Sequence, residues 1–286
     1  MELLRGFEDL IYKIFVFCVG ACVGSFLNVC ILRLPKGKSI VSPASMCACG
    51  KAIKWYDNIP ILSWFILRGK SRCCKTKFSF RYVFVEVICA VLFLSAWIML
   101  GRVEAIVAMF FVSLMILVTF IDIDTLELPD WLTVGGAFAG LVLSTIFPQI
   151  HNAYLSDYPY LISAIRGLLF SSIGLMIGVG LLYFLRLTAE IAFNKEAMGE
   201  GDVVLMACIG AFCGWQGALF SIFIGSLIGA VIMLPLYPIM KKKGEDLMIP
   251  YGPWLALGAI VFMLFCREIT EEYFSTILYM LTLTQN

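Results

Sequence analysis

The chain has 286 residues, of which 61% are hydrophobic and only 14% are charged, and its formal net charge is +1. Soluble domains usually carry about 25% charged residues, so a soluble core could not bury this much apolar surface. The small net charge also excludes the basic footprint of nucleic-acid-binding proteins, and we expect no nucleic acid partner. Runs of about 18 or more apolar residues recur, which indicates an all-α polytopic membrane protein.

About eight transmembrane helices are predicted, in chain order at Ile11–Leu32, Tyr82–Leu100, Val103–Ile121, Trp131–Phe147, Leu161–Leu187, Val203–Gly214, Ala218–Met240 and Pro250–Phe265. The first run is long and no small-residue cleavage site follows it, so we expect a retained span and not a signal peptide. The sixth span is short and could be half-buried or re-entrant. The tail Ile269–Leu283 is amphipathic enough to lie at the membrane interface instead of crossing the membrane.

Basic residues concentrate in the loop after the first predicted span. Between Arg33 and Arg81 there are eleven Lys and Arg residues and one acid, Asp57. Positively charged loops stay in the cytoplasm, so this loop is predicted to be cytoplasmic and to contact membrane lipid. The sequence therefore predicts three parts: a first transmembrane helix at 1–33, a basic cytoplasmic loop subdomain containing cysteines at 34–81, and a helical membrane domain at 82–286.

Four of the eleven cysteines lie in this basic loop, as the pairs Cys47 with Cys49 and Cys73 with Cys74. Disulfides are rare in the reducing cytoplasm, so paired cysteines there suggest a structural zinc site. The spacing argues against it, because zinc sites favour C-x-x-C and the thiols of adjacent cysteines tend to point apart. Zinc ligands and reduced free thiols both remain open from the sequence.

Acidic residues gather at two predicted helix ends on the same side of the membrane as the basic loop. One cluster contains Asp122, Asp124, Glu127 and Asp130, and the other contains Glu200 and Asp202. Acids are costly within membrane spans and usually mark functional sites. The simpler interpretation is that Asp130 and Asp202 cap the helices that follow them, and that Asp124 and Glu127 are solvated.

Asp122 and Asp202 are predicted to meet at one membrane face. Two carboxylates that approach closely cannot both ionise easily, so they share a proton, which suits one as general base and the other as general acid. Gly199 and Gly201 remove side chains beside Asp202, so a substrate backbone or another helix can approach it. The only histidine, His151, is predicted on the outer face, which excludes a cytoplasmic Ser-His-Asp site.

Two other classes of protein compete with a hydrolase. A proton-coupled transporter could carry protons on Asp122 and Asp202, but such transporters usually have internal repeats and acids at the middle of the membrane. A membrane thiol oxidoreductase would need its cysteines on the oxidising side, whereas the charge pattern places them inside.

Six motifs together carry a resemblance that covers nearly the whole chain. They are GSFLNVCILRLP (24–35), NIPILSW (58–64), RYVFVE (81–86), IDIDTLELPDWLT (121–133), MGEGDVVLMACIGAFCGW (198–215) and IPYGPWLALGA (249–259). On these motifs the chain resembles the bacterial type IV prepilin peptidases, which are membrane aspartyl proteases and N-methyltransferases. The resemblance implies that Asp122 and the Gly-x-Gly-Asp aspartate, Asp202, are catalytic.

The resemblance also implies a reaction and a location. We expect an enzyme of the bacterial inner membrane that cleaves the basic leaders of prepilins or pseudopilins after a glycine, on the cytoplasmic side. It would then methylate the new N-terminus with S-adenosylmethionine. Asp124, Asp130, Gly199 and Gly201 are expected to support the site. Glu86 is expected to orient the basic loop or to take part in cofactor binding, but the sequence does not locate the methyl-donor pocket.

The chain departs from the family pattern at three positions. Met46 and Ser71 occupy the first position of each expected C-x-x-C pair, with Cys47 and Cys73 displaced by one or two residues. Val204 stands where the family commonly has a lysine after the Gly-x-Gly-Asp aspartate. These departures put zinc binding and a substrate or lipid contact in doubt, but leave the aspartate pair intact.

Overall fold

The computed structural model describes residues 2–47, 49–194, 198–241 and 250–267, together with 269, 270, 273 and 276. These residues are mainly helical, and the extended pairings among them are two isolated bridges, Met46 with Ala52 and Lys70 with Lys77. The chain forms two compact units, Met1–Ile121 and Asp122–Asn286. The all-α prediction is confirmed.

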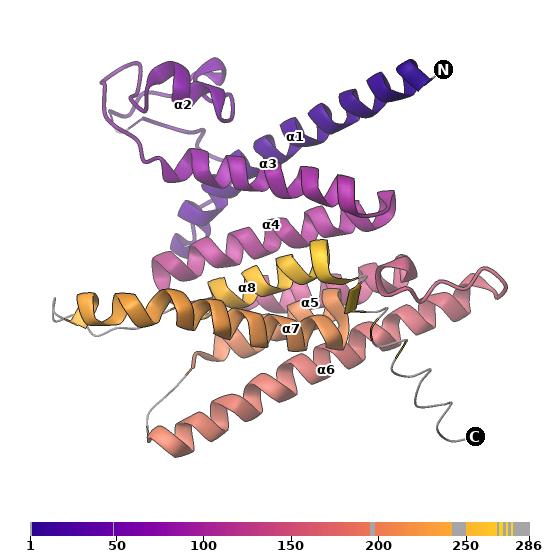
Figure 1. Cartoon of the computed structure of the whole chain (residues 1–286). Helices are drawn as coiled ribbons and strands as arrows, with labels where there is room; N and C mark the ends of the chain where they lie inside the picture. Colours follow the sequence, from indigo (N-terminus) through magenta and orange to yellow (C-terminus); the bar gives the residue numbers. More distant parts are fainter. Residues whose placement is uncertain are drawn as a thin grey trace, which may run out of the picture. The chain divides into compact units, whose positions relative to one another are not determined.

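The first unit is built on two helices in close contact, α1 (Glu2–Arg33) and α3 (Arg81–Met99), followed by most of α4 (Arg102–Thr125) (Figure 1). Two glycines of α1 bring its backbone onto α3. A Cβ added at Gly20 would lie 2.7 Å from Ala90 Cα, and one added at Gly24 would lie 2.7 Å from Glu86 Cα. Small residues four apart allow this close approach of helices in membranes.

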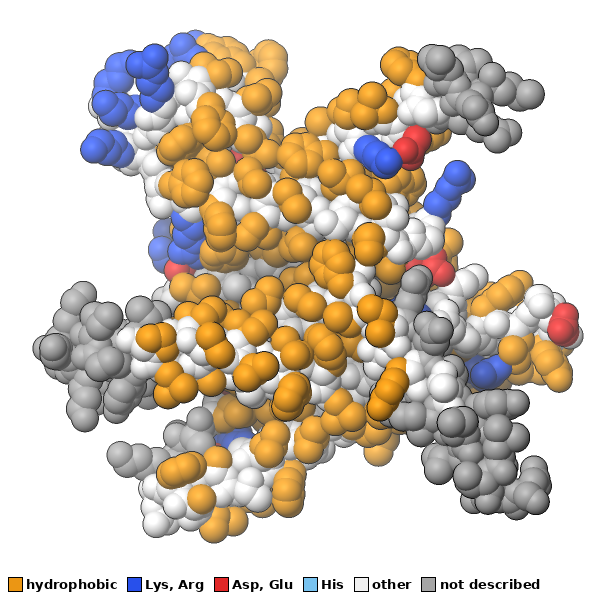
Figure 2. Space-filling view, viewed as in Figure 1, with side chains coloured by type: hydrophobic (Ala, Val, Ile, Leu, Met, Phe, Trp, Pro, Cys, Tyr) orange, Lys and Arg blue, Asp and Glu red, His pale blue; other side chains and the backbone are white. Residues whose placement is uncertain are grey.

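The segment between α1 and α3 carries the turns η1 (Leu34–Lys36) and η2 (Trp55–Asp57) and the short helix α2 (Leu62–Leu67). Asp57 accepts hydrogen bonds from the Arg72 guanidinium at 2.8 to 3.1 Å. The side chain of Arg33 donates to the backbone oxygens of Ser39 and Pro43. Lys and Arg side chains gather over the part of the surface that carries α2 (Figure 2).

The second unit contains α5 (Asp130–Ile146), the turn η3 (Pro148–His151), α6 (Tyr160–Phe193), α7 (Glu200–Lys241) and α8 (Gly252–Val261) with its π-helical extension η4 (Phe262–Cys266). Glycines allow α6 and α7 to pack closely. A Cβ added at Gly174 would lie 2.2 Å from the oxygen of Gly210, so the two backbones touch at this point.

The helix α7 reverses direction at Gly214, whose φ of 68° and ψ of −175° are not helical. Gly174 of α6 touches Gly210 and Gly214, and Gly178, one turn later, touches Met206 and Ala218. Met206 and Ala218 would be about 18 Å apart along one straight helix, yet both lie within 3.4 Å of the same added Cβ, which requires two antiparallel arms. We call residues 200–213 the first arm and residues 215–241 the second arm. The predicted break between the sixth and seventh spans lies at this turn.

The end of the first arm is capped by side chains from its neighbours. The backbone oxygen of Ala211 accepts from Ser171 Oγ at 2.7 Å and from Ser144 Oγ at 3.3 Å, and lies 3.2 Å from His151 Nε2. The last carbonyls of a helix lack partners within it, so these side chains supply them. The His151 ring also lies 3.0 Å from Ser144 Oγ. Both contacts of His151 therefore belong to the capping of this helix end.

In the described residues, five helices are long and apolar enough to cross a membrane: α1, α3, α4, α6 and α7. The apolar segments Asp130–Ile146 and Gly252–Cys266 are shorter. Large apolar side chains cover much of the surface seen in Figure 2, as expected for contact with lipid; Met176 is 71% exposed. A polytopic helical protein is confirmed, whereas eight crossings remains a prediction. Most of the predicted tail lies outside the described residues.

Candidate active site

Asp122 and Asp202 flank one buried glycine in the second unit. Asp122 lies in the last turn of α4 and Asp202 in the first turn of α7, and the two residues are 5% and 8% exposed. A Cβ added at Gly252, the first residue of α8, would lie 2.7 Å from Asp122 Oδ2 and 3.4 Å from Asp202 Oδ1. The two oxygens therefore cannot be further apart than the sum of these distances.

Few hydrogen-bond partners surround the two carboxylates among the described residues. The backbone of Gly252 makes a polar contact with Asp122, and the backbone of Gly199 makes one with Asp202. Asp122 Oδ2 is buried without a hydrogen-bond partner among the described residues. Buried polar atoms normally have a partner, so this oxygen is poised for a proton shared with the second carboxylate or for a polar group of a substrate.

Local backbone geometry holds this end of the unit together. The chain leaves α4 through Leu126, which has a positive φ of 56° and whose N–H donates to the oxygen of Asp122 at 2.8 Å. The loop that follows contacts Gly201 of α7, because an added Cβ at Gly201 would lie 3.0 Å from Leu128 Cβ. Gly201 therefore lets the α4–α5 loop approach the start of α7. The space at Gly199 is less tight, because a Cβ there would be 3.6 Å from Asp202 Oδ2.

The other predicted acids of the first cluster are exposed. Asp124 lies in the last turn of α4, Glu127 on the α4–α5 loop and Asp130 at the start of α5. Pro129 is the N-cap residue of α5, so Asp130 is the first helical residue and not the cap. Asp202 likewise lies within the first turn of α7, where the helix dipole favours a negative charge.

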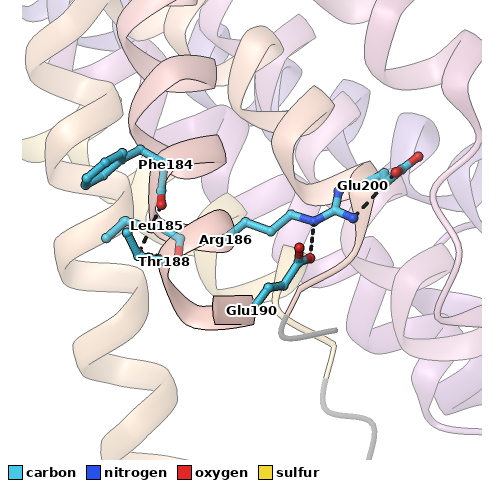
Figure 3. A network of polar contacts seen from close by, with 6 residues as sticks. All are labelled: Phe184, Leu185, Arg186, Thr188, Glu190 and Glu200. Atoms are coloured by element: carbon cyan, nitrogen blue, oxygen red, sulfur yellow. Dashed lines mark hydrogen bonds and ion pairs between the residues drawn. The ribbon is translucent and has the colours of Figure 1, made fainter. Parts of the chain in front are cut away.

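An ion-pair network ties the start of α7 to α6 (Figure 3). Arg186 donates through Nε to Glu190 at 2.8 Å and through an Nη to Glu200 at 3.4 Å. The side chain of Arg186 is 17% exposed and that of Glu200 is 86% exposed. Exposed pairs contribute about 1 kcal/mol or less. The network orients the helix that carries Asp202 without contributing much stability.

Gly252 is a residue of this site that the sequence does not predict. It lies two residues into the predicted span Pro250–Phe265, within the motif IPYGPWLALGA. Only its neighbours in the structure show that the missing side chain allows a close approach.

Glu86 lies in the other compact unit, on α3, and is 8% exposed. Its Oε2 accepts the backbone N–H of Ile61 at 2.7 Å, and its carboxylate also contacts the side chain of Ser25. Glu86 thus connects α3 both to the loop segment and to α1.

The four loop cysteines come together in the first unit. Their sulfur atoms all lie within 4.8 Å of one another, and all four thiols are free. Cys47 Sγ is 3.3 Å from Cys74 Sγ, and Cys49 Sγ is 3.3 Å from Cys73 Sγ. The expectation that adjacent cysteines point apart is wrong here, since the sulfurs of Cys73 and Cys74 are 3.9 Å apart.

Two tight turns explain this convergence despite the short spacing. After Cys49 the chain turns through Gly50 at a φ of 79°, and after Cys74 it turns through Lys75 at a φ of 58°. Each turn is closed by an antiparallel bridge. Hydrogen bonds from Ser71 and then Thr76 lower the pKa of the Cys74 thiol to about 5. Four thiols this close could hold one metal ion.

Comparisons with known proteins agree along most of the chain. A family model described as "Bacterial Peptidase A24 N-terminal domain" matches residues 18–100, and one described as "Type IV leader peptidase family" matches residues 109–234. Curated relatives are each named "Prepilin leader peptidase/N-methyltransferase". The one from Myxococcus xanthus is 37% identical over 80% of this chain and 64% of its own length.

The relative from Pectobacterium carotovorum is 34% identical over 86% of this chain and 90% of its own length. The relative from Aeromonas salmonicida is 31% identical over 97% of this chain and 99% of its own length. No solved structure matches the chain significantly.

Proposed function

Because the chain belongs to the type IV leader peptidase family, we propose that it cleaves the leader peptides of prepilins or pseudopilins and methylates the new N-terminus. The observation that supports this most directly is the placement of Asp122 and Asp202 on either side of Gly252. The family assignment and the site geometry come from different observations, and both lead to an aspartic endopeptidase.

Asp122 and Asp202 act as the catalytic pair in this proposal. One carboxylate, ionised, takes a proton from a water molecule as that water attacks the scissile carbonyl. The other, protonated, donates to the carbonyl oxygen. As the C–N bond breaks, the first carboxyl passes the proton that it took from water to the leaving amine, and the second recovers a proton from the diol. Burial of both side chains keeps bulk water away from the shared proton. Gly199 leaves space beside Asp202, and Gly201 admits Leu128 of the α4–α5 loop.

A leader-cleavage assay with near-isosteric variants tests the pair. Asp122→Asn and Asp202→Asn should each abolish leader removal, measured with purified enzyme and a full-length prepilin in detergent. Asp157→Asn, an exposed acid on the loop after η3, is the matched control and should cleave normally. Cleavage at the wild-type rate by either Asn variant of the pair would contradict the proposal, provided that the variant melts like wild type.

The exposed acids Asp124, Glu127 and Asp130 are proposed to attract the basic leader. Glu127 lies on the α4–α5 loop, whose Leu128 packs against Gly201, and Asp124 and Asp130 lie at the helix ends on either side of this loop. Surface charges of opposite sign raise the association rate and make it depend on salt. Neutralising Asp124 and Asp130 should raise KM at low salt while kcat changes little, and the difference should fade at high salt. An unchanged KM at every salt concentration would overturn this role.

Methyl transfer is the second reaction that we propose, because the relatives are named N-methyltransferases. S-adenosylmethionine, when bound, would supply a methyl group to the new N-terminal amine. The positive charge of the basic loop supports a cytoplasmic location for this chemistry, on the side where the methyl donor is found. The active site accordingly faces the cytoplasm from the bacterial inner membrane.

The segment 34–81 is proposed to be a folded subdomain that binds zinc through Cys47, Cys49, Cys73 and Cys74. A tetrahedral Zn²⁺ site has Zn–S bonds of about 2.3 Å, which puts its sulfurs about 3.8 Å apart. The four sulfur atoms are already grouped at similar distances. The basic surface of this subdomain is also suited to contact anionic lipid.

The alternative of a proton-coupled transporter has no support in the comparisons, all of which point to a peptidase. The wild-type assay above also separates the two, because a transporter would not remove a leader peptide.

A further inference from the structure

Two hydroxyl groups meet beside the aspartate pair in the second unit. Tyr251 directly precedes Gly252, the glycine that the two carboxylates flank. The Tyr251 hydroxyl is 2.7 Å from Ser226 Oγ, on the second arm of α7. It is also close enough to Asp202 for the charge of that carboxylate to act on it. We call Tyr251 and Ser226 the hydroxyl pair, and it belongs to the immediate surroundings of the site.

One O–H of the hydroxyl pair has no partner among the described residues. Each hydroxyl carries one hydrogen and two lone pairs, and the contact between the two oxygens uses one hydrogen. A serine inside a helix can donate instead to the carbonyl four residues before it, as Ser113 donates to Met109. Ser226 makes no such bond within the described part of the chain. A free donor therefore remains, whichever oxygen donates within the pair.

This donor lies where another molecule can reach it. Ser226 is exposed and Tyr251 is half-buried. The neighbours of Ser226 on the second arm are exposed and apolar, since Phe223 is 69% exposed and Leu227 is 50% exposed. They belong to a helix that is long and apolar enough to cross a membrane. Hydrocarbon holds no water that could satisfy a hydroxyl, so a free O–H on this surface calls for an acceptor from another molecule.

The hydroxyl pair is not needed to hold α8 against α7. An added Cβ at Gly225 would lie 2.7 Å from the oxygen of Trp254, so the two backbones already touch. Ser221 Oγ donates to the oxygen of Leu255 at 2.7 Å, which joins the same helices. The backbone oxygen of Tyr251 accepts the N–H groups of Trp254 and Leu255. Tyr251 is therefore fixed at the start of α8 by contacts other than its hydroxyl.

A peptide that is cleaved within the membrane offers the acceptor that this donor needs. The carbonyl oxygens of a helix are bonded to N–H groups of the same helix, and a protease must open these bonds to reach the peptide. The released oxygens have no water to bond with in hydrocarbon. A donor beside the cleaving carboxylates can bond one of them. The phenol of Tyr251 is the more acidic of the two hydroxyls and hence the better donor.

We propose that the Tyr251 hydroxyl accepts a hydrogen bond from Ser226 and donates one to a main-chain carbonyl of the substrate beside the scissile bond. The inference rests on the proposed function, because it adds a substrate-binding residue to that site. The ester carbonyl of a phospholipid is also an acceptor. However, Tyr251 adjoins the glycine between the two carboxylates, where the chain to be cleaved must lie.

Substrate binding without turnover tests the proposal. Full-length protein carrying Asp122→Asn, the parent, is titrated with a fluorescently labelled full-length prepilin in detergent that contains no phospholipid. Adding Tyr251→Phe removes the donor and should raise Kd about three- to tenfold. Adding Ser226→Ala removes only its support and should raise Kd about two- to threefold, whereas Ser226→Thr keeps a hydroxyl and should bind like the parent. Tyr183→Phe, at an exposed tyrosine of α6, is the matched control and should also bind like the parent.

The melting midpoint separates a binding role from a structural one. Tyr251→Phe should melt like the parent, because other contacts hold α8 against α7. An unchanged Kd for Tyr251→Phe would overturn the proposal, whatever its midpoint. So would a rise in Kd that appears only when phospholipid is added, because the hydroxyl would then bind lipid. Leader cleavage by wild type separates the failures: cleavage with equal Kd values overturns only this inference, whereas no cleavage overturns the proposed function.

Discussion

Gly252 leaves the space in which the carboxylate of Asp122 lies. A methyl group at this position would come within 2.7 Å of Asp122 Oδ2, closer than real Cβ contacts allow. Gly252→Ala should therefore displace the carboxylate and reduce leader cleavage about a hundredfold, since small displacements of catalytic groups are costly. Gly135→Ala on α5, where an added Cβ meets nothing within 4 Å, is the control and should cleave normally. Normal cleavage by both variants would contradict the geometry.

Gly201 and Leu128 form a second close contact, and their pairing can be tested by compensation. Gly201→Ala should push on Leu128, whose Cβ would lie 3.0 Å away, and lower kcat about three- to tenfold. Leu128→Gly removes the opposing Cβ, so the double variant should recover part of the loss. Gly199→Ala should have a smaller effect, because its Cβ would make an ordinary contact at 3.6 Å. A strictly additive double variant would show that the two positions do not interact.

The turn at Gly214 should be intolerant of any side chain. Its φ of 68° combined with a ψ of −175° is accessible almost only to glycine, and other residues there cost about 1–3 kcal/mol. Gly214→Ala should lower the melting midpoint in detergent, measured by tryptophan fluorescence. Gly180→Ala on α6, an open position, should melt like wild type. A wild-type midpoint for Gly214→Ala would mean that the reversal is not held as described.

His151 should make stability depend on pH. Burial, and then the charge of Arg267, lower the pKa of His151 to about 4 from an ordinary value of 6.5. Below pH 6.5 the His151 side chain binds a proton in the unfolded chain but stays neutral in the folded chain. The free energy of unfolding should therefore fall as pH drops from about 6.5 to about 4. His151→Gln should show a shallower decrease of the melting midpoint over this range. Parallel curves for the two proteins would rule out His151 as the cause.

The cysteine cluster should carry one zinc ion per chain in purified protein, measured by plasma mass spectrometry. Serine at Cys47 or Cys73 should remove the metal and lower the melting midpoint, because a structural zinc site contributes to folding. Leader cleavage should persist in part, since the cysteines are proposed to be structural. Cys266→Ser, outside the cluster, should keep the metal. Full zinc occupancy in the Cys73→Ser variant would exclude the tetrathiolate arrangement.

The helical fold was predictable because apolar run length is a strong signal in membrane proteins. Even the break before Ala218 was placed within a few residues of Gly214. The antiparallel arms were not predictable, because they follow from one backbone torsion and from glycine contacts between Gly174 or Gly178 and α7. Hydropathy carries no information about such contacts.

The two acids of the candidate site could be predicted from the sequence, but the arrangement of the residues around them could not. Asp122 and Asp202 stood out because charge is rare in this chain. Gly252 could not be assigned, because a missing side chain becomes meaningful only when its neighbours are known. The convergence of the four thiols was not predictable for a similar reason, because their spacing does not reveal the turns at Gly50 and Lys75 that bring the thiols toward one another.

The reversal at Gly214 also limits how deep the first arm can reach. About 14 residues of α-helix rise roughly 21 Å, whereas the hydrocarbon layer is about 30 Å thick. This arm therefore cannot bridge both surfaces, and one of its ends lies below the headgroups or the bilayer thins around it. In the proposed mechanism Asp202 begins this short helix, so the enzyme could meet a lipid-embedded substrate partway into the membrane, without first extracting it into water.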